Sequence, residues 1–147
     1  MIETLWPVRI DKEKGQEENE NCSVFMIHYG DYRIMITGDL DSAGEKQMID
    51  YYSRRNSLEK LDADILKVGH HGSKTSTSDE FLDAVTPEYA VIQVGKNSYG
   101  HPNDETLLRL EKHGITVLRN DLNGAVGFSL KKKIKCHVVI SDKVGYN

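Results

Sequence analysis

Long apolar runs are missing from this sequence. None approaches the roughly 18 to 20 residues that a membrane-spanning helix requires, and the N-terminal region lacks the apolar segment of a signal peptide. We therefore expect a soluble chain, and the sequence itself gives no location. Cysteine is also scarce: Cys22 and Cys136 lie far apart and belong to no CxxC or Cys/His ligand pattern, which argues against a disulfide scaffold and a zinc ribbon.

The sequence also has no excess of positively charged residues. The 147 residues include 19 Lys and Arg against 23 Asp and Glu, a net charge of -4, which argues against blanket electrostatic binding of nucleic acid. A local phosphate-binding site stays open. Neither GxxxxGK[ST] nor GxGxxG occurs, so nucleotide-binding motifs are absent. The length suits one domain, residues 1–147, in which the polar stretch 11–20 is typical of a loop.

Hydrophobic periodicity predicts strands that alternate with helices. Residues 24–27 and 32–37 predict a β-hairpin, and residues 43–55 predict a helix that Asp41 or Ser42 caps. The other expected strands are 65–68, 89–94, 115–118, 125–130 (after a turn at 121–124) and 134–140.

Two further helices are expected between these strands. Thr77 and Glu80 have capping-box spacing, which predicts a short helix that carries Phe81, Leu82 and Val85 and stops before Pro87. Asn103 predicts the cap of a helix that runs to His113, with Leu107, Leu108 and Leu110 facing inward. The order predicts an α/β fold, a layered mixed sheet with flanking helices.

Polar, metal-competent side chains follow three successive strands of this predicted sheet. Asp39 follows residues 32–37, His70 and His71 follow residues 65–68, and His101 follows residues 89–94. Because ligands bind outside the carboxyl ends of strands in open α/β sheets, these loops can converge on one site. Ser73 adds a hydroxyl and an amide that suit an anion.

Each of these residues also has a purely structural interpretation. Asp39 could cap the following helix, the His70–His71 pair could lie in a solvated loop, and His101 could be a turn residue before Pro102. Gly69 and Gly72, which flank the histidine pair, favour a sharp exposed turn. We assign no chemistry to His28, His113 and His137, which lie in the hairpin, the last helical turn and the terminal strand.

A carboxylate with two or three imidazoles is the ligand set of a zinc, manganese or iron site, whereas magnesium and calcium prefer oxygen. Aspartate can bridge two metals about 3.5 to 4 Å apart, as two-metal hydrolases require. Such a site needs no nucleophilic serine or cysteine. A receiver-like domain that uses Asp39 and Asp41 is a different possibility, but nothing in the sequence compels it.

Five segments, read in order, resemble the metallo-β-lactamase-fold domain of competence DNA-uptake proteins of the ComEC type. They are NCSVFMIHYG from Asn21, IMITGD ending at Asp39, LDADILKVGHHGS ending at Ser73, NSYGHP from Asn97 and RNDLNG ending at Gly124. The resemblance implies a four-layer αββα fold, two divalent ions (Zn or Mn) and water-driven hydrolysis, with phosphodiesters as the expected substrates. The parent proteins of that family are membrane-associated.

The same resemblance implies roles for single residues. Asp39 matches the metal-bridging carboxylate, and His70, His71 and His101 match positions at the edge of the site; which of the three is the late metal ligand stays open. We expect Asp39, His70, His71 and His101 to be metal ligands, with Asp39 and His71 as catalytic residues. Ser73 and Tyr99 are the expected substrate-binding residues.

The sequence departs from that family in one respect. The ligand cluster HxHxDH of the superfamily belongs to its N-terminal half, and this chain contains no HxH. The chain therefore resembles the C-terminal part of such a domain, and we expect it to pair with the missing N-terminal half or with a second copy. It is either part of a metal-dependent hydrolase, inactive alone, or a non-catalytic α/β binding or assembly module. The lysines at 131–133 and 135 could bind phosphate or could guard an edge strand against aggregation.

Overall fold

A computed structural model describes residues 1–8 and 22–139, so the predicted loop 11–20 and the predicted strand residue 140 lie outside the described residues. The strands are β1 (Ile2–Trp6), β2 (Val24–Tyr29), β3 (Tyr32–Ile36), β4 (Ile65–Lys67), β5 (Tyr89–Ile92), β6 (Thr116–Arg119), β7 (Ala125–Leu130) and β8 (Ile134–Val139). The helices are α1 (Ser42–Ser53), α2 (Asp79–Val85), α3 (Asp104–Lys112) and α4 (Asn120–Asn123), with 3-10 turns η2 (Leu58–Leu61) and η3 (Gly69–Gly72). No helix in the described ranges is long and apolar enough to cross a membrane.

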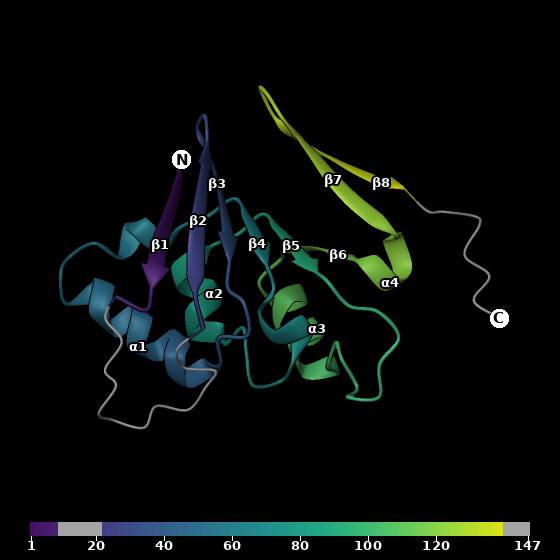
Figure 1. Cartoon of the computed structure of the whole chain (residues 1–147), viewed down its shortest axis with the longest axis horizontal. Helices are drawn as coiled ribbons and strands as arrows, with labels where there is room; N and C mark the ends of the chain where they lie inside the picture. The colour runs from purple at the N-terminus through teal and green to yellow at the C-terminus, as the bar shows by residue number, and fades with distance from the viewer. Residues whose placement is uncertain (9–21, 140–147) are drawn as a thin grey trace.

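Six strands form one mixed sheet in the order β1-β2-β3-β4-β5-β6, which confirms the predicted fold class (Figure 1). β1, β2 and β3 pair antiparallel, whereas β3, β4, β5 and β6 run parallel. The sequence did not predict β1, whose pairing places Ile2 opposite Ile27 at one edge of the sheet. The last two strands form a separate antiparallel hairpin.

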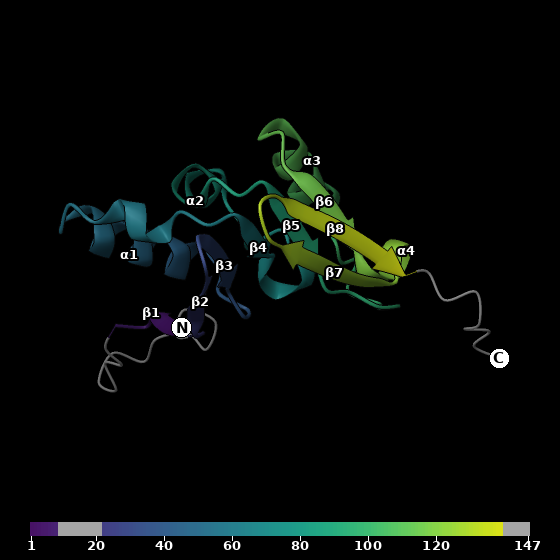
Figure 2. The same ribbon diagram turned by 90° about the horizontal axis from the view of Figure 1, so that it is seen from above.

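Helices α1, α2 and α3 cover one face of the sheet, and the β7–β8 hairpin lies on the opposite side (Figure 2). On the helix face, the parallel register aligns Met35, Leu66 and Ala90, all of which are fully buried. On the outer face it aligns Ile34, Ile65 and Tyr89, and the ring of Tyr89 meets Phe128 of β7 at a centroid distance of 5.5 Å. Strand alternation therefore gives the sheet a helix-covered face and an outer face that the hairpin covers in part.

The helix caps agree with the prediction at two positions and differ at a third. Asp41 accepts a hydrogen bond from Gly44 N at 3.0 Å and caps α1, and Asn103 accepts one from Glu105 N at 3.0 Å and caps α3. The predicted Thr77 cap is wrong: Ser78 Oγ accepts from Phe81 N, while the amide of Thr77 donates to the buried Glu45 carboxylate. Glu45 pairs the amide of Thr77, but the Thr77 hydroxyl is buried without a partner and its φ of 59° is not the extended conformation of a cap residue, so the cap moves one residue along the chain.

Two smaller predictions are also wrong. Leu108 is 54% exposed, because it lies two positions before the buried Leu110 and therefore near the opposite side of the helix. The expected turn at 121–124 is instead the one-turn helix α4, whose N-cap residue Arg119 has extended backbone. Asn123 accepts a hydrogen bond from Arg119 N at 2.8 Å, which closes that turn.

Candidate functional site

Three loops meet where β3, β4 and β5 end. Because these strands are parallel neighbours, the loops that carry Asp39, the His70–His71 pair and His101 leave the same edge of the sheet, as predicted (Figure 1). Backbone hydrogen bonds connect them: His70 N donates to Gly38 O at 3.0 Å, and Asn103 N donates to Gly72 O at 2.8 Å. The middle loop therefore ties the other two together.

The histidine pair has an unusual backbone. His70 and His71 both have left-handed conformations, with φ of 46° and 54°. Each such non-glycine residue costs about 1–3 kcal/mol and persists where the surrounding structure enforces it, which is common at functional sites. Gly72 follows with φ of 82°, and a Cβ built on it would lie 2.7 Å from Cβ of Pro102. Only glycine fits there, and the contact seats the loop of His101 against the histidine turn.

His71 is held in a single tautomer. Its Nδ1 lies 2.6 Å from the carbonyl oxygen of Gln93, which can only accept, so Nδ1 carries the proton and donates. Nε2 then keeps its lone pair. A carbonyl that fixes the second nitrogen in this way is the usual support of a metal-binding histidine. His71 is exposed and, with Tyr99 and His101, lines a pocket of about 300 Å³.

His70 and His101 form the second part of the cluster. Their ring centroids are 5.6 Å apart, and Tyr99 stacks on His101 at 6.1 Å. The Nδ1 atoms of both histidines are buried and have no hydrogen-bond partner. Burial lowers the pKa of His101, and the neighbouring His70 and His71 lower it further, which favours the neutral ring that metals bind. A buried nitrogen without a hydrogen-bond partner can instead donate its lone pair to an electron-pair acceptor, such as a metal ion.

Asn97 shapes the His101 loop and was missed by the sequence reasoning. Its side-chain oxygen accepts from Tyr99 N and His101 N, at 3.0 and 3.1 Å, and its amide nitrogen donates to His101 O at 2.8 Å. This arrangement is an Asx-type turn, for which an asparagine before Ser-Tyr-Gly was the available signal.

Asp39 is half-buried and does not cap α1, since Asp41 does. Beside it lies Lys67, the last residue of β4, whose ammonium is 3.4 Å from the Gly38 carbonyl oxygen. Burial lowers the pKa of Lys67, and the Asp39 carboxylate opposes that change. Lys67 was also missed from the sequence, although a lysine within the apolar run ILKV is itself a signal.

Ser73 and Tyr99 have contrasting surroundings. Ser73 is 5% exposed; its hydroxyl lies 3.0 Å from the Thr75 hydroxyl, and its carbonyl oxygen accepts from Thr106. Tyr99 is 82% exposed above His101. The Ser73 hydroxyl is thus hydrogen-bonded within its own turn, whereas the Tyr99 side chain is accessible. The predicted substrate contacts of both residues stay predictions.

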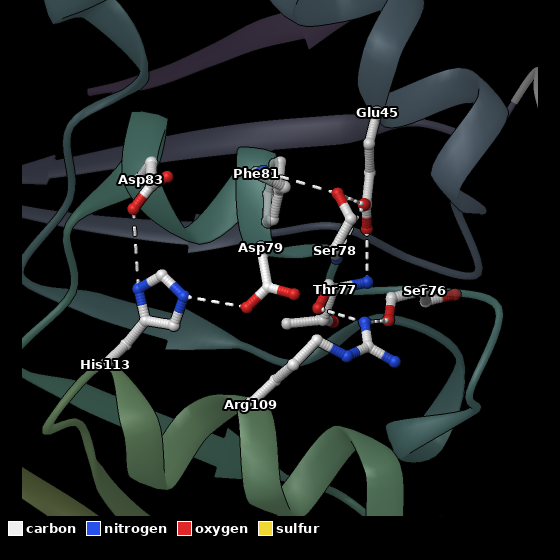
Figure 3. A network of polar contacts seen from close by, with 9 residues as sticks. All are labelled: Glu45, Ser76, Thr77, Ser78, Asp79, Phe81, Asp83, Arg109 and His113. Atoms are coloured by element: carbon white, nitrogen blue, oxygen red, sulfur yellow. Dashed lines mark hydrogen bonds and ion pairs between the residues drawn. The ribbon is translucent and has the colours of Figure 1, made fainter.

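A buried network holds the segment that follows the histidine turn (Figure 3). The Glu45 carboxylate accepts from Ser78 N at 2.9 Å and Ser78 Oγ at 2.7 Å, and Arg109 donates to the carbonyl oxygens of Ser76 and Thr77 at 3.0 and 2.6 Å. Burial raises the pKa of Glu45, and its hydrogen bonds with Ser78 and Thr77 lower it in part. The network joins α1, α3 and the 73–78 segment, so the histidine turn rests on fixed backbone.

The other histidines have structural partners. His28 lies 3.4 Å from Glu3, Nε2 of His113 lies 3.0 Å from Asp79, and His137 lies 2.9 Å from Ser129. The site histidines therefore differ from the rest in their partners as well as their position.

These donor side chains do not form a complete metal-coordination shell among the described residues. Within residues 1–8 and 22–139, no group of three His, Cys, Asp or Glu side chains could by itself hold a metal ion. The unpartnered nitrogens of His70 and His101 and the oriented His71 fit part of a metal-binding shell. Further ligands would have to come from other residues.

The fold and this edge define an α/β protein with a carboxylate and three imidazoles at the carboxyl ends of parallel strands. The sequence matches the metallo-beta-lactamase superfamily over residues 17–96, and the chain belongs to that superfamily. Asp39, His70 and His71 lie within the matched residues, and His101 lies just beyond them.

The chain is similar to three bacterial proteins. It is 40% identical over 124 residues to "Competence protein ComA" of Neisseria gonorrhoeae. The aligned residues make up 84% of this chain and 17% of that protein. It is 38% identical over 118 residues to "ComE operon protein 3" of Bacillus subtilis, with coverage of 80% and 14%. It is 33% identical over 110 residues to "Recombination protein 2" of Haemophilus influenzae, with coverage of 74% and 13%. The resemblance to ComEC-type proteins is confirmed, and the chain spans less than a fifth of the length of each relative.

Proposed function

We propose that this chain supplies one side of a divalent-metal site, for Zn²⁺ or Mn²⁺, in a metal-dependent hydrolase that acts on phosphodiesters. Asp39, His70, His71 and His101 are the proposed ligands. The observation that carries the proposal is the pair of buried, unpartnered Nδ1 atoms of His70 and His101 beside the oriented ring of His71. Neutral imidazoles with free lone pairs and a carboxylate are donors that suit these metals.

Bound metal ions would lower the pKa of a water molecule and stabilise negative charge on the attacked phosphate. The residues of the chain prepare that chemistry. The Gln93 carbonyl holds the Nδ1 proton of His71, so in the neutral ring Nε2 is the nitrogen that accepts, as a ligand or as a base. We propose that the Lys67 ammonium, which lies beside Asp39 and donates to the Gly38 carbonyl oxygen, attracts a phosphate oxygen of the substrate. The exposed Tyr99 ring offers a surface for a base or sugar.

Nucleic acid is the proposed substrate class. The names of the relatives refer to competence and recombination. A phosphodiester also suits a site that combines metal ligands with a half-buried lysine.

A second element completes the proposed site. The outer face of the sheet remains partly apolar and accessible: Ile2 is 69% and Phe25 is 36% exposed, and Ile34 and Ile36 are half-buried. Burying such a face is favourable at about 25 cal/mol per Å². We propose that a segment bearing HxHxDH from the longer protein, or else a second copy of the chain, covers it and contributes the remaining ligands.

Metal stoichiometry tests the proposal. We expect the chain, titrated with Zn²⁺ or Mn²⁺, to bind metal through this partial ligand set, and Asp39→Ala and His101→Ala both to lose that binding. Asp31→Ala and His28→Ala, which change an exposed turn aspartate and a strand histidine, serve as matched controls and should keep it. The chain joined to an HxHxDH-bearing half of a relative should then hydrolyse bis(p-nitrophenyl) phosphate.

A non-catalytic binding or assembly module is the second candidate, and the lack of a complete ligand group within the described residues favours it. Stable pairing with the added half, without metal retention or hydrolysis, would support the module and contradict the hydrolase.

A further inference from the structure

The β7–β8 hairpin concentrates positive charge in an acidic chain. Residues 122–139 contain four lysines (131, 132, 133 and 135) and no Asp or Glu. Since the whole chain carries -4, the other residues sum to -8. Such a charge asymmetry within one domain suggests an interaction with a polyanion.

The hairpin has two chemically distinct faces. Its register pairs Phe128 with Cys136 and Leu130 with Ile134, and these four residues are half-buried. The alternate pairs are Gly127 with His137 and Ser129 with Lys135. Alternation therefore places Phe128, Leu130, Ile134 and Cys136 on an inner face and Ser129, Lys135 and His137 on an outer face, where Val139 at the end of β8 is also exposed.

Contacts with the sheet fix the inner face. Phe128 packs edge-on against Tyr89 of β5, and the Tyr32 hydroxyl donates to the Lys131 carbonyl oxygen at 2.8 Å. The second contact holds the hairpin tip over the start of β3. The apolar half of the hairpin is thus already in use, which leaves the outer face for other roles.

The four lysines, which we name the lysine face, are all exposed. None of them takes part in an ion pair within the ranges that the structure describes. Together with Ser129 and His137 they line an open depression of about 580 Å³. If these lysines served only solubility, acidic residues could alternate with them, as they do in the rest of the chain.

We propose that the lysine face binds the phosphate backbone of a nucleic acid, at a surface separate from the metal site. The choice of nucleic acid as the partner depends on the proposed function, whereas the identification of the binding surface depends only on charge and geometry. A membrane surface fits less well, because interfacial anchors present apolar or aromatic side chains, and residues 131–133 at the tip are all lysine. The lysines offer phosphate contacts without base recognition, so binding is independent of sequence and weakened by salt.

The lysine face and the candidate metal site lie toward opposite ends of β3. Tyr32, which contacts Lys131, begins the strand, and Asp39 follows its end. The five residues of β3, at about 3.3 Å each, put roughly 15 Å between the two ends of the strand. A strand bound at the lysine face could therefore extend to the metal site without competing for it.

The test measures the affinity of a fluorescent 30-nucleotide single strand by anisotropy, in EDTA, across a KCl series. Wild type is compared with the quadruple variant K131Q/K132Q/K133Q/K135Q. A matched quadruple variant, K46Q/K60Q/K74Q/K112Q, removes the same charge from exposed lysines elsewhere. Circular dichroism checks that all three proteins are folded.

We expect a wild-type slope of log K against log salt of about -2 to -3, from three to four phosphate contacts at about 0.7 each. The lysine-face variant should lose most of this slope and bind at least tenfold more weakly at 50 mM KCl, whereas the matched variant should stay within about threefold of wild type. Because the assay contains EDTA, failure of the metal proposal would leave this result intact.

Several results would overturn the proposal. Equal weakening by both quadruple variants would assign binding to net charge alone. Unchanged binding with new self-association of the lysine-face variant would show that the lysines only protect an edge. Lysine-dependent binding to phosphatidylserine vesicles, without binding to the oligonucleotide, would identify a membrane surface instead.

Discussion

Gly72 is the point at which two loops of the candidate site touch, and its replacement by alanine tests that contact. Its φ of 82° is left-handed, which costs a residue with a Cβ roughly 1–2 kcal/mol. The added Cβ would also lie 2.7 Å from Cβ and 3.1 Å from Cα of Pro102, and 3.4 Å from Ile92. Overpacking of this kind adds about 1–3 kcal/mol. We therefore expect Gly72→Ala to lower the free energy of unfolding by about 2–5 kcal/mol.

Two other glycines separate the causes of this loss. Gly100 has φ of 75° with nothing within 4 Å of an added Cβ, so Gly100→Ala should cost only the roughly 1–2 kcal/mol of backbone strain. Gly95 has neither a left-handed φ nor a close neighbour, and Gly95→Ala should change stability by no more than about 1 kcal/mol. Urea denaturation followed by circular dichroism measures all three. If Gly72→Ala were as stable as Gly95→Ala, the proposed seating of the His101 loop would be refuted.

Three further predictions concern Asn97, Lys67 and Asp121. Asn97→Ala removes the acceptor of two backbone amides, so amide exchange at Tyr99 and His101 should accelerate about tenfold, while Ser98→Ala should leave it unchanged; equal rates would exclude the Asx-type turn. Lys67→Met removes a cation beside Asp39 and should tighten Zn²⁺ binding by about three- to tenfold in a chelator competition, unlike Lys96→Met; weaker binding would contradict the repulsion. The Arg119 guanidinium lowers the pKa of Asp121 below its usual 3.8, so its contribution to stability is present above pH 3.8 and is lost as the pH falls through the lowered value. Wild type should therefore lose more thermal stability than Asp121→Asn between pH 4 and pH 2, and parallel melting curves would count against the pair.

Much of the fold was predictable because apolar periodicity and turn residues coincide in this chain. The β2–β3 hairpin, the parallel strands and the helices follow from patterns that are local in sequence. The Thr77 cap failed because the partner that decided it, Glu45, lies 32 residues away. Leu108 was misplaced because three leucines in four positions cannot all face one side of a helix.

The candidate site was predictable as residue types at strand ends, but its chemistry was not. That His71 donates through Nδ1 depends on the carbonyl of Gln93 in another strand-end loop. The unpartnered nitrogens of His70 and His101 arise from the packing of two loops about 30 residues apart. The role of Lys67 also required the sheet register, which brings β4 alongside the Gly38–Asp39 turn.

We propose above all that three strand-end loops share one metal-binding edge. The most direct test is a Zn²⁺ titration of the ¹⁵N-labelled chain, followed through the ring nitrogens of all six histidines. We predict that His70, His71 and His101 shift together, that His71 keeps its Nδ1 proton and coordinates through Nε2, and that His28, His113 and His137 stay unchanged. Shifts confined to the last three, or coordination of His71 through Nδ1, would contradict the account.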